Sequence, residues 1–167
     1  MRTRVRKPGF SLTELVIVVV IIGIIAAIAA PRLAEGGAAA ADAALRGSLR
    51  TLRGAIDMYA GEHDNVWPAS KPADRSEATF IDQLTKKTNS AGAVGNAPGE
   101  HIFGPYLRGI PPVPVGPNVG ARGIDLKTTG FVYEAVLSAG WVYNYDTGEI
   151  YANTDDLGQD GVGYNTY

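Results

Sequence analysis

The sequence predicts an α+β fold in which a long N-terminal α-helix, membrane-spanning in its first half, packs on a small C-terminal antiparallel β-sheet. Three observations support this prediction. Residues 15–30 contain no charged side chain. Apolar residues then recur at the spacing of one helix face as far as Tyr59, and the C-terminal third alternates with the two-residue period of β-strands.

The apolar segment is long enough to cross a membrane. Residues 10–30 would extend about 31 Å as a helix, which matches the hydrocarbon thickness of a bilayer. Four basic residues precede it, at positions 2, 4, 6 and 7, and the chain after residue 9 holds more acidic than basic residues. The positive-inside rule therefore predicts a cytoplasmic N-terminus and an extracytoplasmic remainder. An acidic body also argues against nucleic-acid binding as a main role.

Hydropathy alone leaves two simple interpretations, a single-span anchor or a secretory signal peptide cut near "AIAAP". Neither accounts for Glu14, a carboxylate at the start of the apolar segment. A charged residue at the centre of a membrane helix costs about 2.5–3.5 kcal/mol on insertion scales, and intramembrane carboxylates are usually functional. Glu14 therefore calls for a partner that offsets its cost.

The stretch "KPGFSLTELVIVVVIIGIIAAIAAP", residues 7–31, resembles the N-terminus of type IV pilins and type II secretion pseudopilins. The resemblance implies that prepilin peptidase cuts between Gly9 and Phe10 and that the new amine of Phe10 is methylated. Glu14 is the fifth residue after the cut, where the family's glutamate pairs with the N-terminal amine of a neighbouring subunit. Pro31 lies where the family often has a helix-kinking proline.

The resemblance also implies an organisation and a role. Residues 1–9 would be the leader peptide, 10–30 the transmembrane and filament-core helix, 31–60 its continuation, and 61–167 a small globular head. The implied function is that of a structural subunit, not an enzyme, in a type II secretion pseudopilus. It would polymerise with itself and with other pseudopilins on the assembly platform of the inner membrane, and its head would be periplasmic.

Two alternatives stay open for this role. One is a subunit of a type IV pilus used for adhesion, motility or DNA uptake, and the other is a membrane-anchored binding domain that does not polymerise. The short body, the absence of cysteine and the acidic C-terminal segment favour the pseudopilus over the pilus. Glu14 and the Gly9–Phe10 junction argue against a monomeric anchor, which needs neither.

Beyond the apolar segment, the helix is expected to continue to about Tyr59. Five residues share one face and are predicted core: Leu45, Leu49, Leu52, Ile56 and Tyr59. The pairs Asp42–Arg46 and Arg53–Asp57 have the i, i+4 spacing of helical ion pairs. Gly36–Gly37 could form a soft joint, because glycine costs about 1 kcal/mol relative to alanine in a helix.

The head is predicted to contain a second helix at residues 74–87, with Phe80, Ile81 and Leu84 facing inward. Residues 88–123, rich in Gly and Pro, are predicted to form a long loop. Strands are predicted at 129–136, 140–145 and 149–154, with the last two joined in a hairpin by Gly148. Three aromatic residues of the middle strand alternate onto one face as predicted core, namely Trp141, Tyr143 and Tyr145.

No set of residues predicts catalysis, and His63 and His101 are expected in solvated loops. The segment "NTDDLGQDGVGYN", residues 153–165, gathers Asp155, Asp156 and Asp160 among glycines. Carboxylate oxygens are the ligands that Ca²⁺ prefers, although the spacing is not that of an EF-hand. Major pseudopilins bind calcium in an acidic C-terminal loop, so the resemblance implies a calcium site here. The alternative is a solvated acidic segment.

Overall fold

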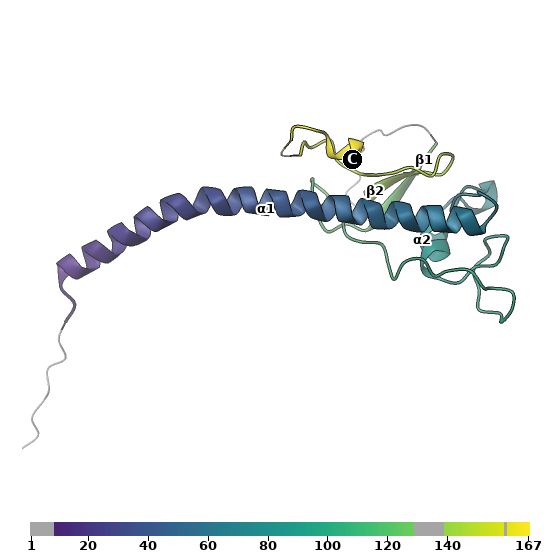
Figure 1. Cartoon of the computed structure of the whole chain (residues 1–167), viewed down its shortest axis with the longest axis horizontal. Helices are drawn as coiled ribbons and strands as arrows, with labels where there is room; N and C mark the ends of the chain where they lie inside the picture. Colours follow the sequence, from purple (N-terminus) through teal and green to yellow (C-terminus); the bar gives the residue numbers. More distant parts are fainter. Residues whose placement is uncertain (1–8, 129–138, 159) are drawn as a thin grey trace, which may run out of the picture. The chain divides into compact units, whose positions relative to one another are not determined.

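A computed structural model describes residues 9–128, 139–158 and 160–167 of the chain (Figure 1). The elements in chain order are α1 (Leu12–Glu62), a 3-10 helix (Pro72–Asp74), α2 (Glu77–Thr85), β1 (Gly123–Lys127), β2 (Ala139–Asn144), β3 (Ile150–Ala152) and a second 3-10 helix (Tyr164–Thr166). By its internal contacts the chain divides into two compact units, residues 1–39 and 40–167. The α+β fold predicted from the sequence is therefore confirmed.

The first unit contains the N-terminal part of α1. The backbone is helical at every position of α1, from Leu12 to Glu62, including Pro31 and the Gly36–Gly37 pair. Leu, Ile, Val and Ala dominate up to Ala30 and leave little polar side chain to compete with the backbone for hydrogen bonds. The soft joint at Gly36–Gly37 stays a prediction, and both glycines lie inside a continuous helix.

The second unit is built around the rest of α1, residues 40–62. The five apolar residues predicted to share one helix face are all buried, with exposed fractions of 2% or less. They form a common core with Phe80 and Leu84 of α2 and with Trp141, Tyr143 and Ile150 of the sheet. The predicted core stripe is therefore confirmed, and α1 extends to Glu62, three residues beyond the predicted end.

Helix α2 is shorter than the predicted 74–87 at both ends, and its start is fixed by a capping residue. Ser76 is the N-cap, and its Oγ accepts a hydrogen bond of 3.1 Å from the backbone N–H of Thr79. Phe80 and Leu84 are fully buried as predicted, and Ile81 is half-buried. This helix thus supplies one wall of the core of the second unit.

The sheet is mixed, not wholly antiparallel as predicted. Strand β2 is central: it pairs with β1 in parallel and with β3 in antiparallel orientation. The hairpin of β2 and β3 is confirmed, and Gly148 has the predicted positive φ, at 76°. The strand predicted at 129–136 lies outside the described residues, and the third strand, β1, is formed by the segment just before it.

All six residues of β2 are buried, because both faces of this central strand are covered. Trp141 and Tyr143 are fully buried core residues, as predicted, and Tyr145 beyond the strand is half-buried. The polar atoms of both buried aromatics have partners. The Trp141 indole N–H donates to the carbonyl of Pro111 at 2.9 Å, and the Tyr143 hydroxyl donates to that of Pro68 at 3.1 Å.

The predicted long loop is confirmed between α2 and β1. Residues 88–122, all of them described, contain no helix and no strand of the sheet. The loop nevertheless belongs to the core, because four of its apolar side chains are buried there: Leu107, Ile110, Val113 and Val115. It is held to α2 where the backbone N–H groups of Tyr106 and Leu107 both donate to the carbonyl of Leu84.

The prediction that both histidines are solvated is wrong for His63, which is only 3% exposed. Its Nδ1 lies 2.7 Å from the carbonyl oxygen of Tyr59, so this nitrogen donates and caps the last turn of α1. Its Nε2 lies 3.0 Å from the hydroxyl of Thr88, and the ring stacks on Tyr59 at 3.9 Å. His101 is half-buried.

Candidate processing and assembly site

The predicted cleavage junction lies on exposed backbone just ahead of α1. Gly9 and Phe10 are outside any helix or strand, and Phe10 is 85% exposed. A Cβ atom added to Gly9 would meet nothing within 4 Å. The fold therefore does not require glycine at this position, so a requirement for Gly9 has to come from the enzyme that reads the junction.

Glu14 has a structural role that the sequence reasoning missed. Ser11 directly precedes the helix, and its backbone N–H donates a hydrogen bond of 2.8 Å to Oε2 of Glu14. The Oγ of Ser11 accepts a hydrogen bond of 3.3 Å from the backbone N–H of Thr13. Ser followed by Glu three residues later is the capping-box pattern, so the signal was present in the sequence.

The capping box uses only part of the hydrogen-bonding capacity of the Glu14 carboxylate. A carboxylate offers about four lone-pair sites on two oxygens, and Oε2 accepts the bond from Ser11. Among the described residues, no other hydrogen bond or ion pair reaches this side chain. Glu14 can therefore hold the helix start in place and still accept a hydrogen bond from outside its own chain.

The segment Leu12–Ala30 is apolar on all sides, and no other described part of the first unit buries its side chains. Leu12–Ala30 has a mean hydropathy of 2.9, and among the described helices it is the only one long and apolar enough to cross a membrane. Its large side chains from Leu15 to Ile28 are about half exposed. A membrane anchor and a cleavable signal sequence both have these properties, so hydropathy does not choose between them.

Comparison with protein families adds an observation that hydropathy does not supply. A family model described as the prokaryotic N-terminal methylation motif matches residues 4–30. The chain carries an N-terminal methylation motif. The resemblance to type IV pilin-like proteins is thereby confirmed over these residues, and the methylation motif includes Gly9, Phe10 and Glu14. Searches of curated proteins and of solved structures gave no match.

The geometry of the Gly9–Phe10 junction is compatible with the two reactions that the methylation motif implies, peptide-bond cleavage and methylation of the new amine. A peptidase needs an extended, accessible bond, and the Gly9–Phe10 bond is exposed and precedes the first helical turn. Methylation needs the amine that this cut would create. The specific roles of Gly9, Phe10 and Glu14 stay predictions.

The three aspartates of the predicted calcium site lie in the C-terminal segment. Asp155 and Asp156 are exposed, whereas both carboxylate oxygens of Asp160 already have partners. Oδ2 of Asp160 lies 3.1 Å from a guanidinium nitrogen of Arg46, and Oδ1 accepts hydrogen bonds of 3.0 Å from the backbone of Val162 and from the hydroxyl of Tyr167.

These contacts already satisfy the carboxylate of Asp160 without a metal ion. The hydrogen bond from the backbone of Val162, followed by those from Tyr167 and Arg46, lowers the pKa of Asp160 below its ordinary value. Within the described residues, which leave out position 159, no three His, Cys, Asp or Glu side chains gather to hold a metal ion. The arrangement does not fit a site made by all three aspartates, and calcium binding stays a prediction.

Proposed function

We propose that the chain is a structural subunit of a type II secretion pseudopilus, cut after Gly9 by prepilin peptidase, methylated on Phe10 and polymerised through α1. The observation that carries the proposal is the methylation motif. Its cleavage junction is exposed and directly precedes a 51-residue helix. Proteins of the type IV pilin-like kind are generally structural and not enzymatic, which agrees with the absence of a catalytic motif in the sequence.

Before assembly, the segment Leu12–Ala30 would anchor the subunit in the inner membrane with its head outside the cytoplasm. The transfer from lipid to filament gains little hydrophobic free energy, because lipid chains are as apolar as the side chains of a neighbouring helix. Packing and polar pairs must therefore decide which arrangement forms.

Glu14 would supply such a polar pair. A carboxylate that pairs with the amine of a neighbouring Phe10 in a filament core would be tolerated there, whereas a misplaced subunit would leave it unpaired. Breaking a buried ion pair costs about 3–5 kcal/mol, which favours one register over the others. Prepilin peptidase, the assembly platform, other pseudopilins and further copies of the chain are the partners this mechanism requires.

The type IV pilus remains the alternative use of the same motif and helix. The absence of cysteine and the acidic C-terminal segment support the secretion pseudopilus. Deleting the gene in its host separates the two. We expect loss of protein export across the outer membrane with motility and adhesion unchanged, and the opposite result would assign the chain to a pilus.

The primary experiment is N-terminal sequencing and intact-mass measurement of the mature protein from its host. The proposal predicts a chain that starts at Phe10 and carries one methyl group on its amine. A chain that starts near Ala30 or Pro31 would instead identify an ordinary signal peptide. A chain that keeps residues 1–9 would identify a simple membrane anchor.

A further inference from the structure

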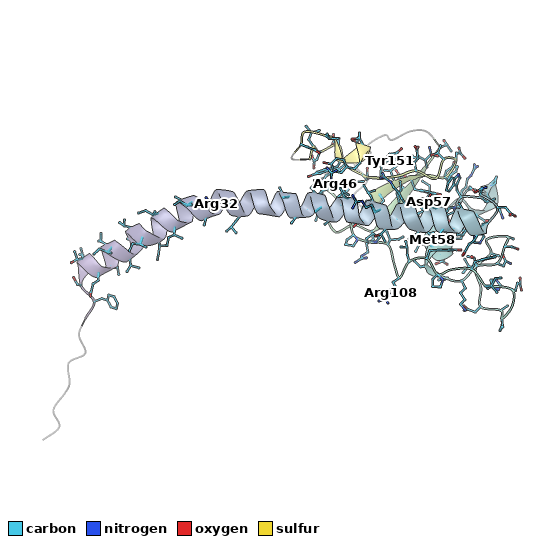
Figure 2. The ribbon with its side chains drawn as sticks, in the orientation of Figure 1. Arg32, Arg46, Asp57, Met58, Arg108 and Tyr151 are labelled. Carbon is cyan, nitrogen blue, oxygen red and sulfur yellow. The ribbon has the colours of Figure 1, made fainter. Side chains whose placement is uncertain are left out.

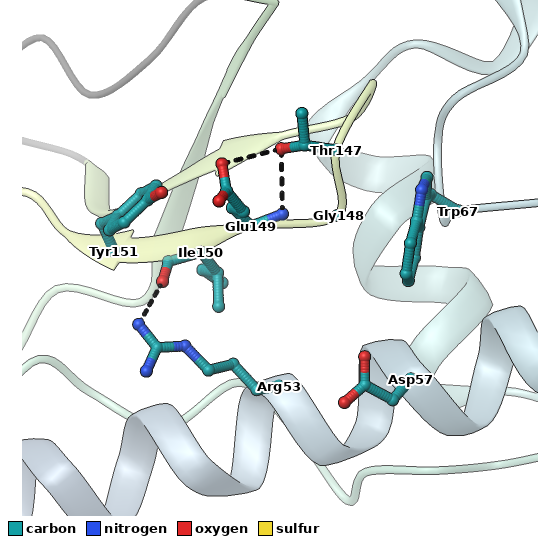
Figure 3. A pocket seen from close by; sticks show the side chains of 8 residues that line it. All are labelled: Arg53, Asp57, Trp67, Thr147, Gly148, Glu149, Ile150 and Tyr151. Atoms are coloured by element: carbon teal, nitrogen blue, oxygen red, sulfur yellow. Dashed lines mark hydrogen bonds between the residues drawn. The ribbon is translucent and has the colours of Figure 1, made fainter.

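A pocket of about 320 Å³ opens between α1 and the β2–β3 hairpin in the second unit (Figure 3). One side of it is the helix face that carries Arg53 and Asp57, and the hairpin forms another. Eight residues line the pocket: Arg53, Asp57, Trp67, Thr147, Gly148, Glu149, Ile150 and Tyr151.

The carboxylate of Asp57 faces this pocket and has no partner among the described residues (Figure 3). The sequence predicted an ion pair with Arg53, and that pair does not form. Arg53 instead donates to the backbone carbonyls of Ile150, at 3.1 Å, and of Tyr167. Within the described part of the chain Asp57 makes no hydrogen bond or ion pair, and its side chain is exposed (Figure 3).

The indole of Trp67 lines the same pocket as this carboxylate (Figure 3). The half-buried indole of Trp67 lies against Gly148, where an added Cβ would be only 2.6 Å from the ring, so glycine allows this close approach. A second carboxylate, Glu149, borders the pocket and accepts a hydrogen bond of 3.0 Å from the hydroxyl of Thr147. Asp57 and Trp67 therefore line the same pocket, and Glu149 adds a second carboxylate on the hairpin side.

This combination suits a guanidinium group. A planar guanidinium stacks on an aromatic ring and binds a carboxylate through two parallel hydrogen bonds, which an ammonium group cannot do. Arg53, the cation that lines the pocket, already donates hydrogen bonds to two carbonyl oxygens. The ligand class is therefore an arginine side chain from another molecule.

A second copy of the chain could supply this arginine, provided that one is exposed, without a partner and away from the pocket. In the second unit, three exposed cations have no partner among the described residues: Arg50, Lys87 and Arg108. Arg50 shares the helix face of Arg53 and Asp57, so it lies on the pocket's own side of the molecule. Figure 2 shows Arg108 on one side of α1 and Tyr151, which lines the pocket, on the other.

The position of Arg108 also suits a docking side chain. Its neighbours Leu107 and Ile110 are buried, with exposed fractions of 8% and 5%, and they fix the loop on the core. Arg108 is exposed between these two anchors. A fixed backbone lowers the entropy lost when the side chain binds.

We propose that Arg108 of one copy of the chain docks into the pocket formed by Asp57 and Trp67 of a second copy. The proposal rests on the proposed function, because it describes a contact between heads in a filament. The donor and the pocket lie on different faces, so the contact is heterologous. Such a contact repeats from copy to copy instead of closing a dimer, and in the proposed filament the repeat is an open helix.

Charge reversal with rescue tests this contact in the host that forms the filament. Arg108→Glu and Asp57→Arg should each lower filament yield about tenfold, and the double variant should restore it. Lys87→Glu is the matched control, since it reverses an equally exposed cation, and it should leave the yield unchanged. None of these side chains has an intramolecular partner among the described residues, so the thermal unfolding of the monomer should not change.

Thiol cross-linking gives a second measurement, because the chain has no cysteine of its own. A direct disulfide would be too short to replace an arginine side chain, so a bifunctional thiol reagent about as long as that side chain is used. With this reagent Asp57→Cys combined with Arg108→Cys should give a ladder of multimers, and Asp57→Cys combined with Lys87→Cys should give none. Normal filaments from Arg108→Glu, with the wild type cut after Gly9, would overturn the docking and leave the proposed function standing. A wild-type chain that is not cut after Gly9 would overturn both.

Discussion

The carboxylate of Glu14 lies 2.8 Å from the backbone nitrogen of Ser11 and accepts its hydrogen bond. This bond gives the charged side chain a partner within its own subunit, before any neighbour is present. Glu14 thus has two separable roles: it closes the first turn of α1 through a capping box, and we propose that it pairs with an amine after assembly.

Substitutions of Glu14 separate these two roles. Glu14→Gln keeps an acceptor for the N–H of Ser11, because the capping box accepts either residue, but it removes the charge. Glu14→Ala removes both. We expect filament yield to fall to a similar low level in both variants, measured by imaging of sheared filaments, because the charge is what the neighbouring amine requires.

Ser11→Ala provides the matched control. It removes the hydroxyl cap, at a cost of about 0.5–2 kcal/mol to the helix start, and leaves the carboxylate of Glu14 in place. Filament yield should then stay near that of the wild type. Normal yield from Glu14→Gln would instead show that the cap, and not the charge, is what assembly needs.

Replacement of Gly9 tests the processing step separately from the fold. A Cβ atom at Gly9 would meet no atom within 4 Å and the residue is exposed, so we expect Gly9→Leu to fold and insert normally. We expect it to accumulate in the membrane as a full-length precursor, detected by its intact mass. The mature length in this variant would show that the peptidase does not read this glycine.

The buried His63 should matter for stability. His63→Phe keeps a ring beside Tyr59 but removes the donor to the Tyr59 carbonyl and the partner of the Thr88 hydroxyl. An unsatisfied buried polar group costs about 1–3 kcal/mol, so the free energy of unfolding in urea should fall by that order. Adding Thr88→Val to this variant should cost less than the sum of the two single changes, because both partners are then apolar.

The elements predicted well from the sequence are those fixed by local spacing. The core stripe from Leu45 to Tyr59 follows from the helical period, and the β2–β3 hairpin follows from a short turn that includes Gly148. The parallel pairing of β1 with β2 does not follow from local pattern, because parallel strands cannot be joined by a tight hairpin turn that the sequence would reveal.

The environments of His63 and Arg53 were predicted wrongly because their partners are far away in the sequence. His63 is buried by Thr88 and Asn89, which are 25 and 26 residues away in sequence, so its loop context gave no sign of burial. Arg53 prefers carbonyls of β3 and the C-terminal segment to the neighbouring Asp57, and these acceptors are about a hundred residues away. The capping box of Glu14, in contrast, was visible in the sequence.

Calcium and Arg46 compete for Asp160 if the predicted calcium site is correct, because the guanidinium already lies 3.1 Å from its carboxylate. Millimolar calcium should then raise the melting temperature of Arg46→Gln more than that of the wild type, each measured against chelator on the full chain in detergent. Asp156→Ala should reduce the calcium effect in both backgrounds. The absence of a calcium effect in both proteins would leave the acidic segment as a solvated one.

The folded state should lose stability at alkaline pH, because it contains tyrosines whose pKa values are raised. Burial, with a smaller effect from Asp74, raises the pKa of Tyr59 to about 12, and burial also raises the pKa values of Tyr143 and Tyr106. In the unfolded chain these phenols lose their protons near pH 10. The folded state therefore binds more protons above that pH, so its stability should fall as the pH rises from about 10 towards 12.

Tyr143→Phe tests this linkage, since it removes one buried phenol and its hydrogen bond to Pro68. At neutral pH the variant should be less stable than the wild type, because the carbonyl of Pro68 loses its donor. Between about pH 9 and about pH 11 it should lose less additional stability, measured by urea unfolding with tyrosinate absorbance as the probe. An equal alkaline loss in the two proteins would show that Tyr143 does not contribute to the pH dependence.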